Sequence, residues 1–168
     1  MNRRHCIIAL LALVLPGVSS AKDDPGKTKV ARLSVKVYHA TNGDPKSAGE
    51  KSQTVDKETT QRLTSEKRLR FKHYRLLGGD MQPLLRSYES WSQPLKPSDE
   101  VLVRFEAQGQ PTRKTAVIDL ELWLGRKKIL KTDAKLEGDK PLFVLGPEWR
   151  GGRLIIAVVL APEPKPAS

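Results

Sequence analysis

The chain has 168 residues, of which 38% are hydrophobic, 5% aromatic and 29% charged, and its formal net charge is +11. This composition is typical of one globular domain and excludes a collagen-like, disulfide-rich or multi-spanning membrane protein. The apolar periodicity of the later segments also argues against a wholly disordered chain.

The first 21 residues have the layout of a secretory signal peptide. Arg3 and Arg4 precede an apolar run from Cys6 to Leu15, and small residues up to Ala21 lead into a polar stretch. The alternative is a membrane anchor, but the run is shorter than the roughly 20 residues that span a bilayer. We therefore expect cleavage near Ala21 and export to the periplasm or the medium. The mature domain would then contain no cysteine and no transmembrane segment.

The mature chain has the pattern of one domain between two polar ends. Residues 22–30 are predicted to form a flexible leader, and residues 162–168 alternate proline with polar residues, which predicts a disordered, extended tail. Residues 31–161 lie between them and contain no internal repeat. We therefore expect a single β-rich domain over this range.

The first half of this domain contains a predicted strand, a predicted helix and a predicted hairpin. Apolar and polar residues alternate over Leu33–Tyr38, which indicates a half-buried strand, and Val55–Leu69 favours a short, mostly exposed helix. Phe71–Leu77 and Met81–Trp91 are predicted to be the arms of the hairpin. The turn is placed at Gly78, Gly79 and Asp80, because glycine makes such a turn at little cost.

The second half begins with a predicted connection, a strand and the clearest hairpin. Prolines in residues 93–98 predict a connection, and Val101–Gln108 alternates as a strand does. In the hairpin, Ala116–Leu124 and Lys128–Leu136 both carry their apolar side chains at even positions. Since directly opposed residues share a face, even positions must pair with even positions. The loop between the arms must then hold an odd number of residues, and we predict three or five. Lys131 is then predicted to face Asp119 or Glu121.

The last predicted strand, Leu154–Leu160, is apolar at both even and odd positions. A strand with water on one side would alternate, so this strand is expected to be central in its sheet and covered on both faces. Six or seven strands with one short helix predict a mainly β fold. The expected architecture is an antiparallel β-sandwich or a strongly twisted antiparallel sheet.

The sequence shows no recognisable catalytic constellation, and we expect no cofactor and no metal. The mature chain contains only two histidines, His39 and His73, and no G-x-S-x-G motif. His39 follows the inward parity of its strand, which indicates a hydrogen-bonded residue at the strand end, and His73 is expected to be exposed. An alternative is a carboxylate-based hydrolase of envelope polysaccharide, with Glu89 and Asp99 as its pair, or Glu148 with an acid of the tail.

Basic residues gather in two segments and are interleaved with aromatic residues, as in binding patches for anionic partners. Export argues against nucleic acid and favours an envelope protein or an anionic polymer, while a solvated basic face without a partner is the alternative. Trp123 either lies under a helix or loop, or is exposed beside the lysines. The candidate partner-binding residues are Arg68, Arg70, Lys72, Arg75, Lys127, Lys131, Lys135 and Trp123.

Three segments, Phe71–Leu77, Leu136–Leu142 and Gly146–Ile156, resemble small exported bacterial β-domain proteins. The resemblance implies a signal peptide, a short helix and a compact sheet domain, and it supplies no catalytic or ligand-binding residue. Together with the charge and the predicted export, it leads to the hypothesis of a non-enzymatic binding domain in a bacterial envelope.

Overall fold

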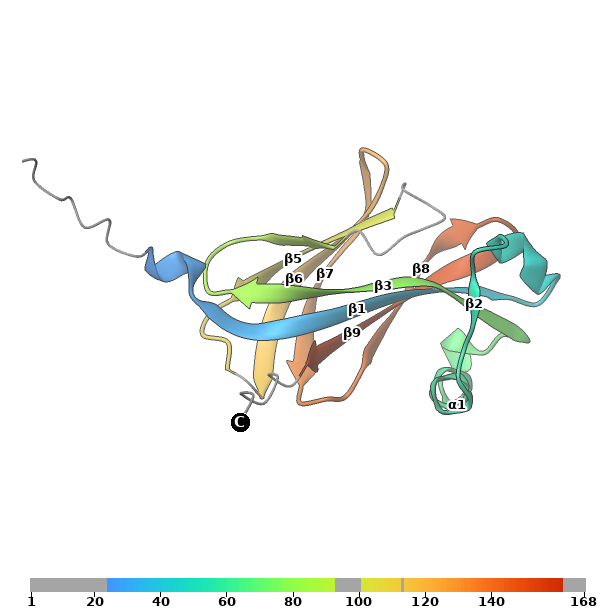
Figure 1. Ribbon diagram of the computed structural model, residues 1–168, viewed down its shortest axis with the longest axis horizontal. Helices are drawn as coiled ribbons and strands as arrows, with labels where there is room; N and C mark the ends of the chain where they lie inside the picture. Colours follow the sequence, from blue (N-terminus) through green and yellow to red (C-terminus); the bar gives the residue numbers. More distant parts are fainter. Residues whose placement is uncertain (1–23, 93–100, 113, 162–168) are drawn as a thin grey trace, which may run out of the picture.

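The computed structural model describes residues 24–92, 101–112 and 114–161 (Figure 1). These residues form two antiparallel sheets, which lie as two layers, and one α-helix. The prediction of a mainly β fold of the sandwich type with one short helix is confirmed. The predicted signal peptide, the connection at residues 93–98, Asp99 and the predicted tail lie outside the described residues.

The first layer is a five-stranded sheet with the strand order β2-β3-β1-β9-β8. Its strands are β1 (Lys29–Thr41), β2 (Gln53–Thr54), β3 (His73–Leu85), β8 (Leu142–Trp149) and β9 (Gly152–Ala161). Three short 3-10 helices lie between or before these strands: η1 (Pro25–Lys27), η2 (Pro45–Ala48) and η3 (Lys67–Leu69). Strand β1 thus begins at Lys29, within the segment predicted as a leader.

The second layer is a four-stranded sheet with the order β4-β5-β6-β7. Its strands are β4 (Ser90–Ser92), β5 (Val101–Gln108), β6 (Thr115–Leu124) and β7 (Lys127–Glu137). The bounds of β5 are those predicted from the alternation. All pairs of neighbouring strands in both sheets are antiparallel, as expected.

The predicted loop length of the β6–β7 hairpin is wrong, although most of its predicted pairing is right. Leu124 pairs with Lys127, so the loop contains two residues, but the register shifts between Leu122 and Trp123. This β-bulge adds one residue to β7 and restores the pairing of even with even positions, such as Ile118 with Ala134. The bulge therefore places even positions opposite even positions, which is the effect expected of a loop with three or five residues.

The predicted hairpin turn at Gly78–Asp80 is also wrong, because β3 runs through it without turning. Gly78 pairs with Val37 and Leu76 with Tyr38, so the extra residue is taken up as a bulge. A Cβ atom on Gly79 would lie 3.1 Å from Lys36 Cγ and 3.3 Å from the Val35 carbonyl oxygen. Gly79 thus serves a close approach between two long strands rather than a turn.

The main core lies between the two layers and contains the inward-facing residues of both. Leu33, Val35 and Val37 of β1 pack in the same cluster as Phe105 of β5 and Leu120 of β6, and all are almost fully buried. Strand β9 lies between β1 and β8, which confirms the central position predicted for it.

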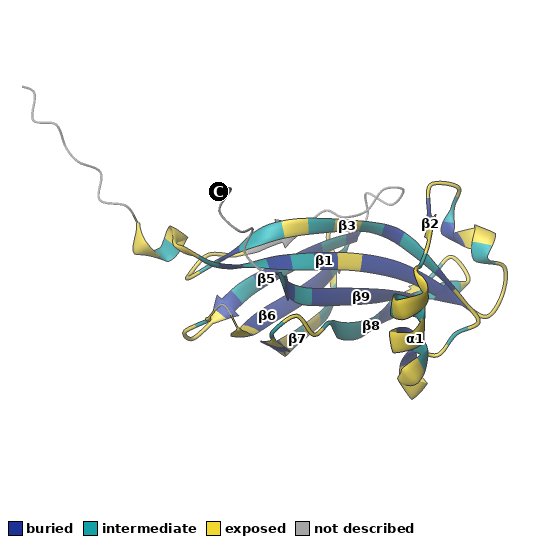
Figure 2. Cartoon of the chain, turned by 60° about the horizontal axis from the view of Figure 1, so that its bottom comes forward, coloured by how far each residue is buried: buried dark blue, intermediate teal, exposed yellow. Residues whose placement is uncertain are grey.

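A second apolar cluster lies on the outer face of the five-stranded sheet, under α1 (Lys57–Ser65). The carboxylate of Asp56 caps this helix by accepting a hydrogen bond from the Thr59 backbone N–H at 2.7 Å. Leu63 is the buried residue of the helix, and it packs in one cluster with Tyr38 and Ile155. In Figure 2 the helix lies at one end of this face, so it covers the sheet only in part. Within the described residues, no helix combines the length and apolarity needed to cross a membrane.

Strand β8 was not predicted, because Gly146 and Pro147 are typical of a loop between strands. In the structure they lie inside β8, where the register with β9 shifts between Leu145 and Glu148. Gly146 is buried, and a Cβ atom there would lie 3.1 Å from the carbonyl oxygen of Leu154. The glycine therefore permits a bulge in β8. Strand β8 pairs with β9 on one side and forms the edge of the sheet on the other.

Candidate functional site

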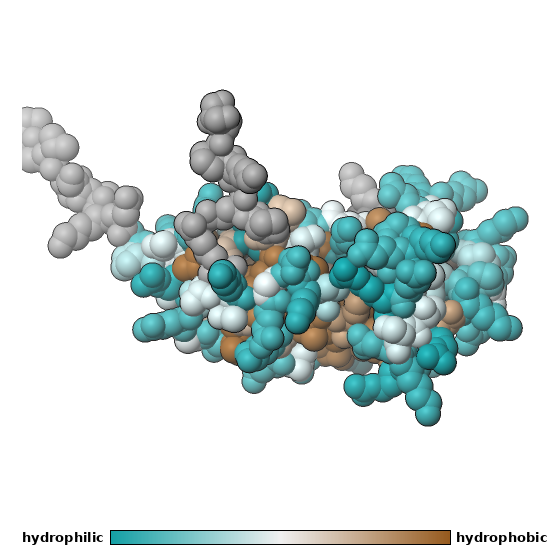
Figure 3. All heavy atoms as spheres, turned by 90° about the horizontal axis from the view of Figure 1, so that it is seen from below, coloured by the Kyte–Doolittle hydropathy of each residue, from teal (hydrophilic) through white to brown (hydrophobic). Residues whose placement is uncertain are grey.

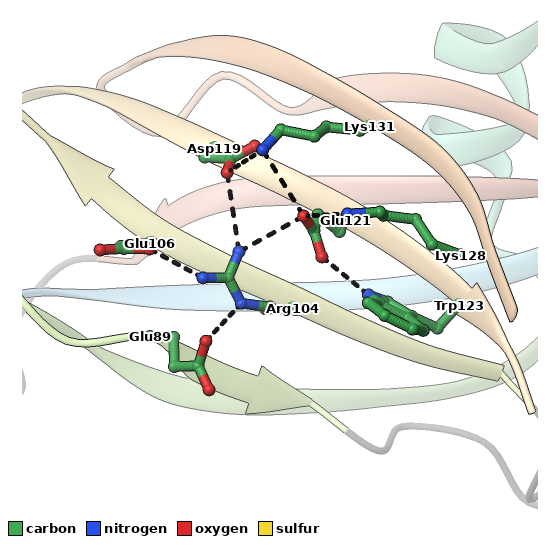
Figure 4. Close-up of polar contacts among 8 residues, drawn as sticks. All are labelled: Glu89, Arg104, Glu106, Asp119, Glu121, Trp123, Lys128 and Lys131. Atoms are coloured by element: carbon green, nitrogen blue, oxygen red, sulfur yellow. Dashed lines mark hydrogen bonds and ion pairs between the residues drawn. The ribbon is translucent and has the colours of Figure 1, made fainter. Parts of the chain in front are cut away.

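The outer face of the four-stranded sheet carries a cluster of charged side chains (Figure 4). They come from β5, β6 and β7 and from Glu89, which precedes β4, and Trp123 lies among them. We call these residues the charged cluster: Glu89, Arg104, Glu106, Asp119, Glu121, Trp123, Lys128 and Lys131.

Arg104 lies at the centre of the charged cluster. Its guanidinium donates to Glu89 Oε2 at 2.5 Å and to Glu106 Oε2 at 2.8 Å. Its third nitrogen lies 3.6 Å from both Asp119 Oδ2 and Glu121 Oε1. The side chain of Arg104 is only 15% exposed, so one cation serves four carboxylates from a largely buried position.

Two lysines complete the charged cluster from β7. Lys131 Nζ lies 2.9 Å from Asp119 Oδ2 and 3.6 Å from Glu121 Oε1, which confirms the prediction that it faces these acids. Lys128 Nζ lies 2.9 Å from Glu121 Oε1 and 5.4 Å from the centre of the Trp123 ring. Trp123 is half-buried, and its Nε1–H donates to Glu121 Oε2 at 2.9 Å. Trp123 therefore lies within the ion-pair network of Glu121 and Lys128.

The network keeps Glu121 ionised. The hydrogen bond from Lys128, helped by the one from Trp123 and by the charges of Lys128 and Arg104, lowers the pKa of Glu121 against the opposing effect of burial. A general acid in a carboxylate hydrolase needs a raised pKa instead. Likewise, the hydrogen bond to Asp119 raises the pKa of Lys131, so its ammonium stays protonated. The carboxylate of Glu121 and the ammonium of Lys131 therefore attract each other as opposite charges across the two strands.

Four other candidate partner-binding residues lie outside the charged cluster. Arg75 donates to the Ser52 carbonyl oxygen at 2.5 Å and to Thr54 Oγ1 at 3.1 Å, and so fastens the short strand β2. Arg70 donates to the carbonyl oxygen of Thr64 at 3.0 Å, near the end of α1. Lys72 is exposed, and its backbone N–H donates to Asn42 Oδ1. Lys127 is exposed at the start of β7.

Arg68 and Lys135, by contrast, meet in one groove, which we call the β7–β8 groove. It has a volume of about 590 Å³ and lies where the edge strand of one sheet passes the edge strand of the other. Its lining comes from Leu130 and Thr132–Lys135 of β7, Leu142–Leu145 of β8, and Glu66, Arg68 and Leu69 beside or in η3.

The lining of the groove combines apolar side chains with charged ones and is partly open to solvent. Leu130, Leu142 and Val144 are half-buried and pack against the main core, while Phe143 and Leu145 are half-buried and pack against the second cluster. Figure 3, seen from below, shows hydrophobic surface in the middle of the molecule with hydrophilic residues on both sides. Apolar surface that stays partly open to water and is bordered by polar residues is a common property of binding sites.

At the far end of β8, the half-buried Trp149 contacts two residues that differ in their burial. The exposed Arg150 guanidinium lies 4.4 Å above the ring of Trp149, and the fully buried ring of His39 meets the ring edge-on at 5.7 Å. His39 Nε2 lies 3.1 Å from the Trp149 carbonyl oxygen, and Thr41 Oγ1 donates to the Gly151 carbonyl oxygen. The interpretation of His39 as a hydrogen-bonded residue at a strand end agrees with this geometry.

Within the described residues, no group of three or more His, Cys, Asp or Glu side chains is arranged to hold a metal ion. Several aspartates instead shape turns: Asp24 accepts from the Gly26 N–H and Asp44 from the Lys46 N–H.

Sequence reasoning missed Arg104 as the shared partner of Asp119 and Glu121 on β6, and it missed Glu89 and Glu106 as further partners of Arg104. The alternation in Val101–Gln108 contains a usable signal. Arg104 and Glu106 stand between inward-facing apolar residues, which places both on the outer face. Comparison of the chain with protein-family models, with curated proteins and with solved structures gives no match.

Proposed function

We propose that this chain is a non-enzymatic binding domain of a bacterial cell envelope and that it holds a protein partner in the β7–β8 groove. One observation carries the proposal: Leu142–Leu145 of β8 are four successive apolar residues at the edge of a sheet that are only partly buried. Leaving such a surface open to water is unfavourable, and binding a partner removes the apolar area from water.

The sequence supports the envelope as the location. Residues 1–21 combine a basic start, an apolar run and small residues before a polar stretch, which is the layout of a secretory signal. The sequence after residue 21 contains no cysteine, so export would leave no thiol exposed to oxidation.

The charges at the groove favour a protein over an anionic polymer. Its lining contains two acids, Glu66 and Asp133, and two bases, Arg68 and Lys135, so the formal charge is balanced. A polyanion would meet these acids as well as the bases, whereas an uncharged apolar segment fits the lining without leaving a buried charge. We therefore propose an apolar protein surface as the ligand, and polymer binding becomes an outcome of the test.

The test is site-specific photocrosslinking in envelope extract from the source cells. Benzoylphenylalanine replaces Val144 in the groove or, as the matched control, Val117, which is 41% exposed on the outer face of the other sheet. The proposal predicts a discrete protein adduct from position 144 that is absent from position 117. Equal adducts from both positions, no adduct from position 144, or an adduct that contains polymer instead of protein would each contradict it.

A further inference from the structure

We infer that the partner contributes an extended segment that pairs with β8 as an added strand of the five-stranded sheet. This inference rests on the proposed function, because it states how the partner is held in the β7–β8 groove. Strand addition of this kind combines backbone hydrogen bonds to a sheet edge with pockets for alternate side chains.

The argument begins with the edges of the two sheets in the described part of the chain. Folded proteins protect unused edges by keeping them short or by placing charges and prolines on them. Strand β2 has two residues and β4 has three, so neither offers a long edge. Strand β7 is long but carries Lys127, Lys128, Lys131 and Lys135.

Strand β8 is protected at one end only. Its second half contains the Gly146–Pro147 bulge and the exposed Glu148, and these features interrupt any further pairing. Its first half, Leu142–Leu145, contains neither a charge nor a proline nor a bulge. Among the edges compared, this half strand is therefore the one that an incoming strand can use.

The side chains of this half strand have the pattern of a central strand. Leu142 and Val144 pack toward the main core, and Phe143 and Leu145 toward the second cluster, so both faces are apolar. Its neighbour β9 has the same pattern, is paired on both sides, and is mostly dark blue in Figure 2, where β8 is teal. Two apolar faces are typical of strands that are paired and covered on both sides. Among the residues that the structure describes, no strand provides the second pairing that the side chains of β8 suit.

The groove sets the size and chemistry of the added segment. Four residues of strand are about 13 Å long, which matches the unprotected length of β8. One side of the segment would face Leu130 and Ala134, and the other would lie beside Leu69. Since the acids and bases around the groove balance, the fitting segment is uncharged and apolar on both faces, with branched or aromatic residues that suit a strand.

The first part of the experiment selects random linear peptides from a display library on the full chain. Val144→Lys is compared with Val117→Lys, which places the same charge on an exposed strand position outside the groove. The expected result is binding that weakens by about tenfold or more in Val144→Lys and by less than about twofold in Val117→Lys. Phe143→Lys serves as a second groove variant, and circular dichroism shows which variants keep the fold.

The second part tests backbone pairing directly. Each residue of a selected peptide is N-methylated in turn, which removes one backbone donor at a time. Pairing as a strand predicts that alternate positions lose about fivefold or more in affinity while the positions between them tolerate the change. If the peptide binds in the groove but N-methylation has no alternating effect, strand addition is wrong and the proposed binding function stands.

Two further outcomes overturn the inference. If no selected peptide is sensitive to Val144→Lys or Phe143→Lys and no adduct forms from position 144, the proposed function fails together with the strand addition. If sedimentation shows a dimer that Val144→Lys dissociates, the occupant is a second copy of this chain rather than a partner protein.

Discussion

The imidazole of His39 on β1 lies 3.1 Å, through Nε2, from the carbonyl oxygen of Trp149 on β8, 110 residues later in the chain. Since a carbonyl oxygen accepts, Nε2–H is the donor, and the neutral ring then has no proton on Nδ1. Nδ1 is buried and has no hydrogen-bond partner among the described residues. The neutral ring therefore fits this position, and a second proton would have no acceptor.

We predict that this contact makes the fold sensitive to mild acid. Burial lowers the pKa of His39 from its ordinary value of 6.5, and the charge of Arg150 lowers it further, against the opposing hydrogen bonds to the backbone of Trp149 and Arg150. The unfolded chain therefore binds the proton first, and stability that is present above about pH 6.5 is lost as the pH falls toward the lowered pKa. Urea unfolding from pH 7.5 to 5 should show this loss in the wild-type chain and in His73→Gln, but not in His39→Gln. Equal pH profiles for His39→Gln and the wild type would contradict the prediction.

The same corner of the fold predicts that Gly152 tolerates no side chain. A Cβ atom on Gly152 would overlap the His39 ring and lie 2.5 Å from the carbonyl oxygen of Ala40. Gly152→Ala should therefore lower the free energy of unfolding by about 2 kcal/mol or more, as overpacked sites do. Gly43→Ala is the matched control, because the nearest atom to its Cβ is Thr41 Oγ1 at 3.6 Å. Equal stabilities of the two variants in urea unfolding would refute this account.

Arg104 provides a third prediction, on the charged cluster. Arg104→Met leaves Asp119 and Glu121 buried on the sheet face with the two lysines as their remaining cations in the charged cluster. The expected loss of stability is about 3 kcal/mol, since removing one member of a buried ion network leaves charges uncompensated. Arg126→Met, at an exposed turn position, should change stability by less than about 0.5 kcal/mol. Comparable values for the two variants in denaturant unfolding would show that the cluster contributes little.

Much of the fold could be predicted because hydrophobic patterns are local. Apolar residues at both even and odd positions of Leu154–Leu160 predict a central strand, as β9 is. The apolar residues at even positions of Ala116–Leu124 predict which side chains of that strand enter the core. The errors arose where one local signal fits two structures. Gly78 and Gly79 are compatible with a turn or with a close approach of strands, and only the packing of β1 beside them decides.

The candidate site could be predicted less well, because it depends on contacts between distant segments. Arg68 and Lys135 come from two separate basic segments of the sequence, and their meeting in the groove depends on how η3 packs beside the two sheet edges. The role of Arg104 required the register of β5 and β6, which no local pattern contains. Strand β8 was missed because Gly146 and Pro147 are more frequent in connections than in strands.

Export provides a fourth prediction, independent of the fold. When the full chain is expressed in a bacterium, the mature protein should start at Lys22, because the small residues before it suit signal peptidase. Intact-mass measurement of the protein from the periplasm and the medium checks this. A protein that retains residues 1–21, or that stays in the cytoplasm, would refute the predicted export and leave the groove proposal to be tested inside the cell.

The central claim, that Leu142–Leu145 form an open edge which an added strand completes, is tested most directly by amide hydrogen exchange. The backbone N–H groups of this segment that point away from β9 should exchange quickly in the free, monomeric chain and become protected when a selected peptide or the crosslinked partner is bound. The N–H groups of β9 should be protected in both states. Protection of the whole segment in the free monomer, or no gain of protection on binding, would contradict the claim.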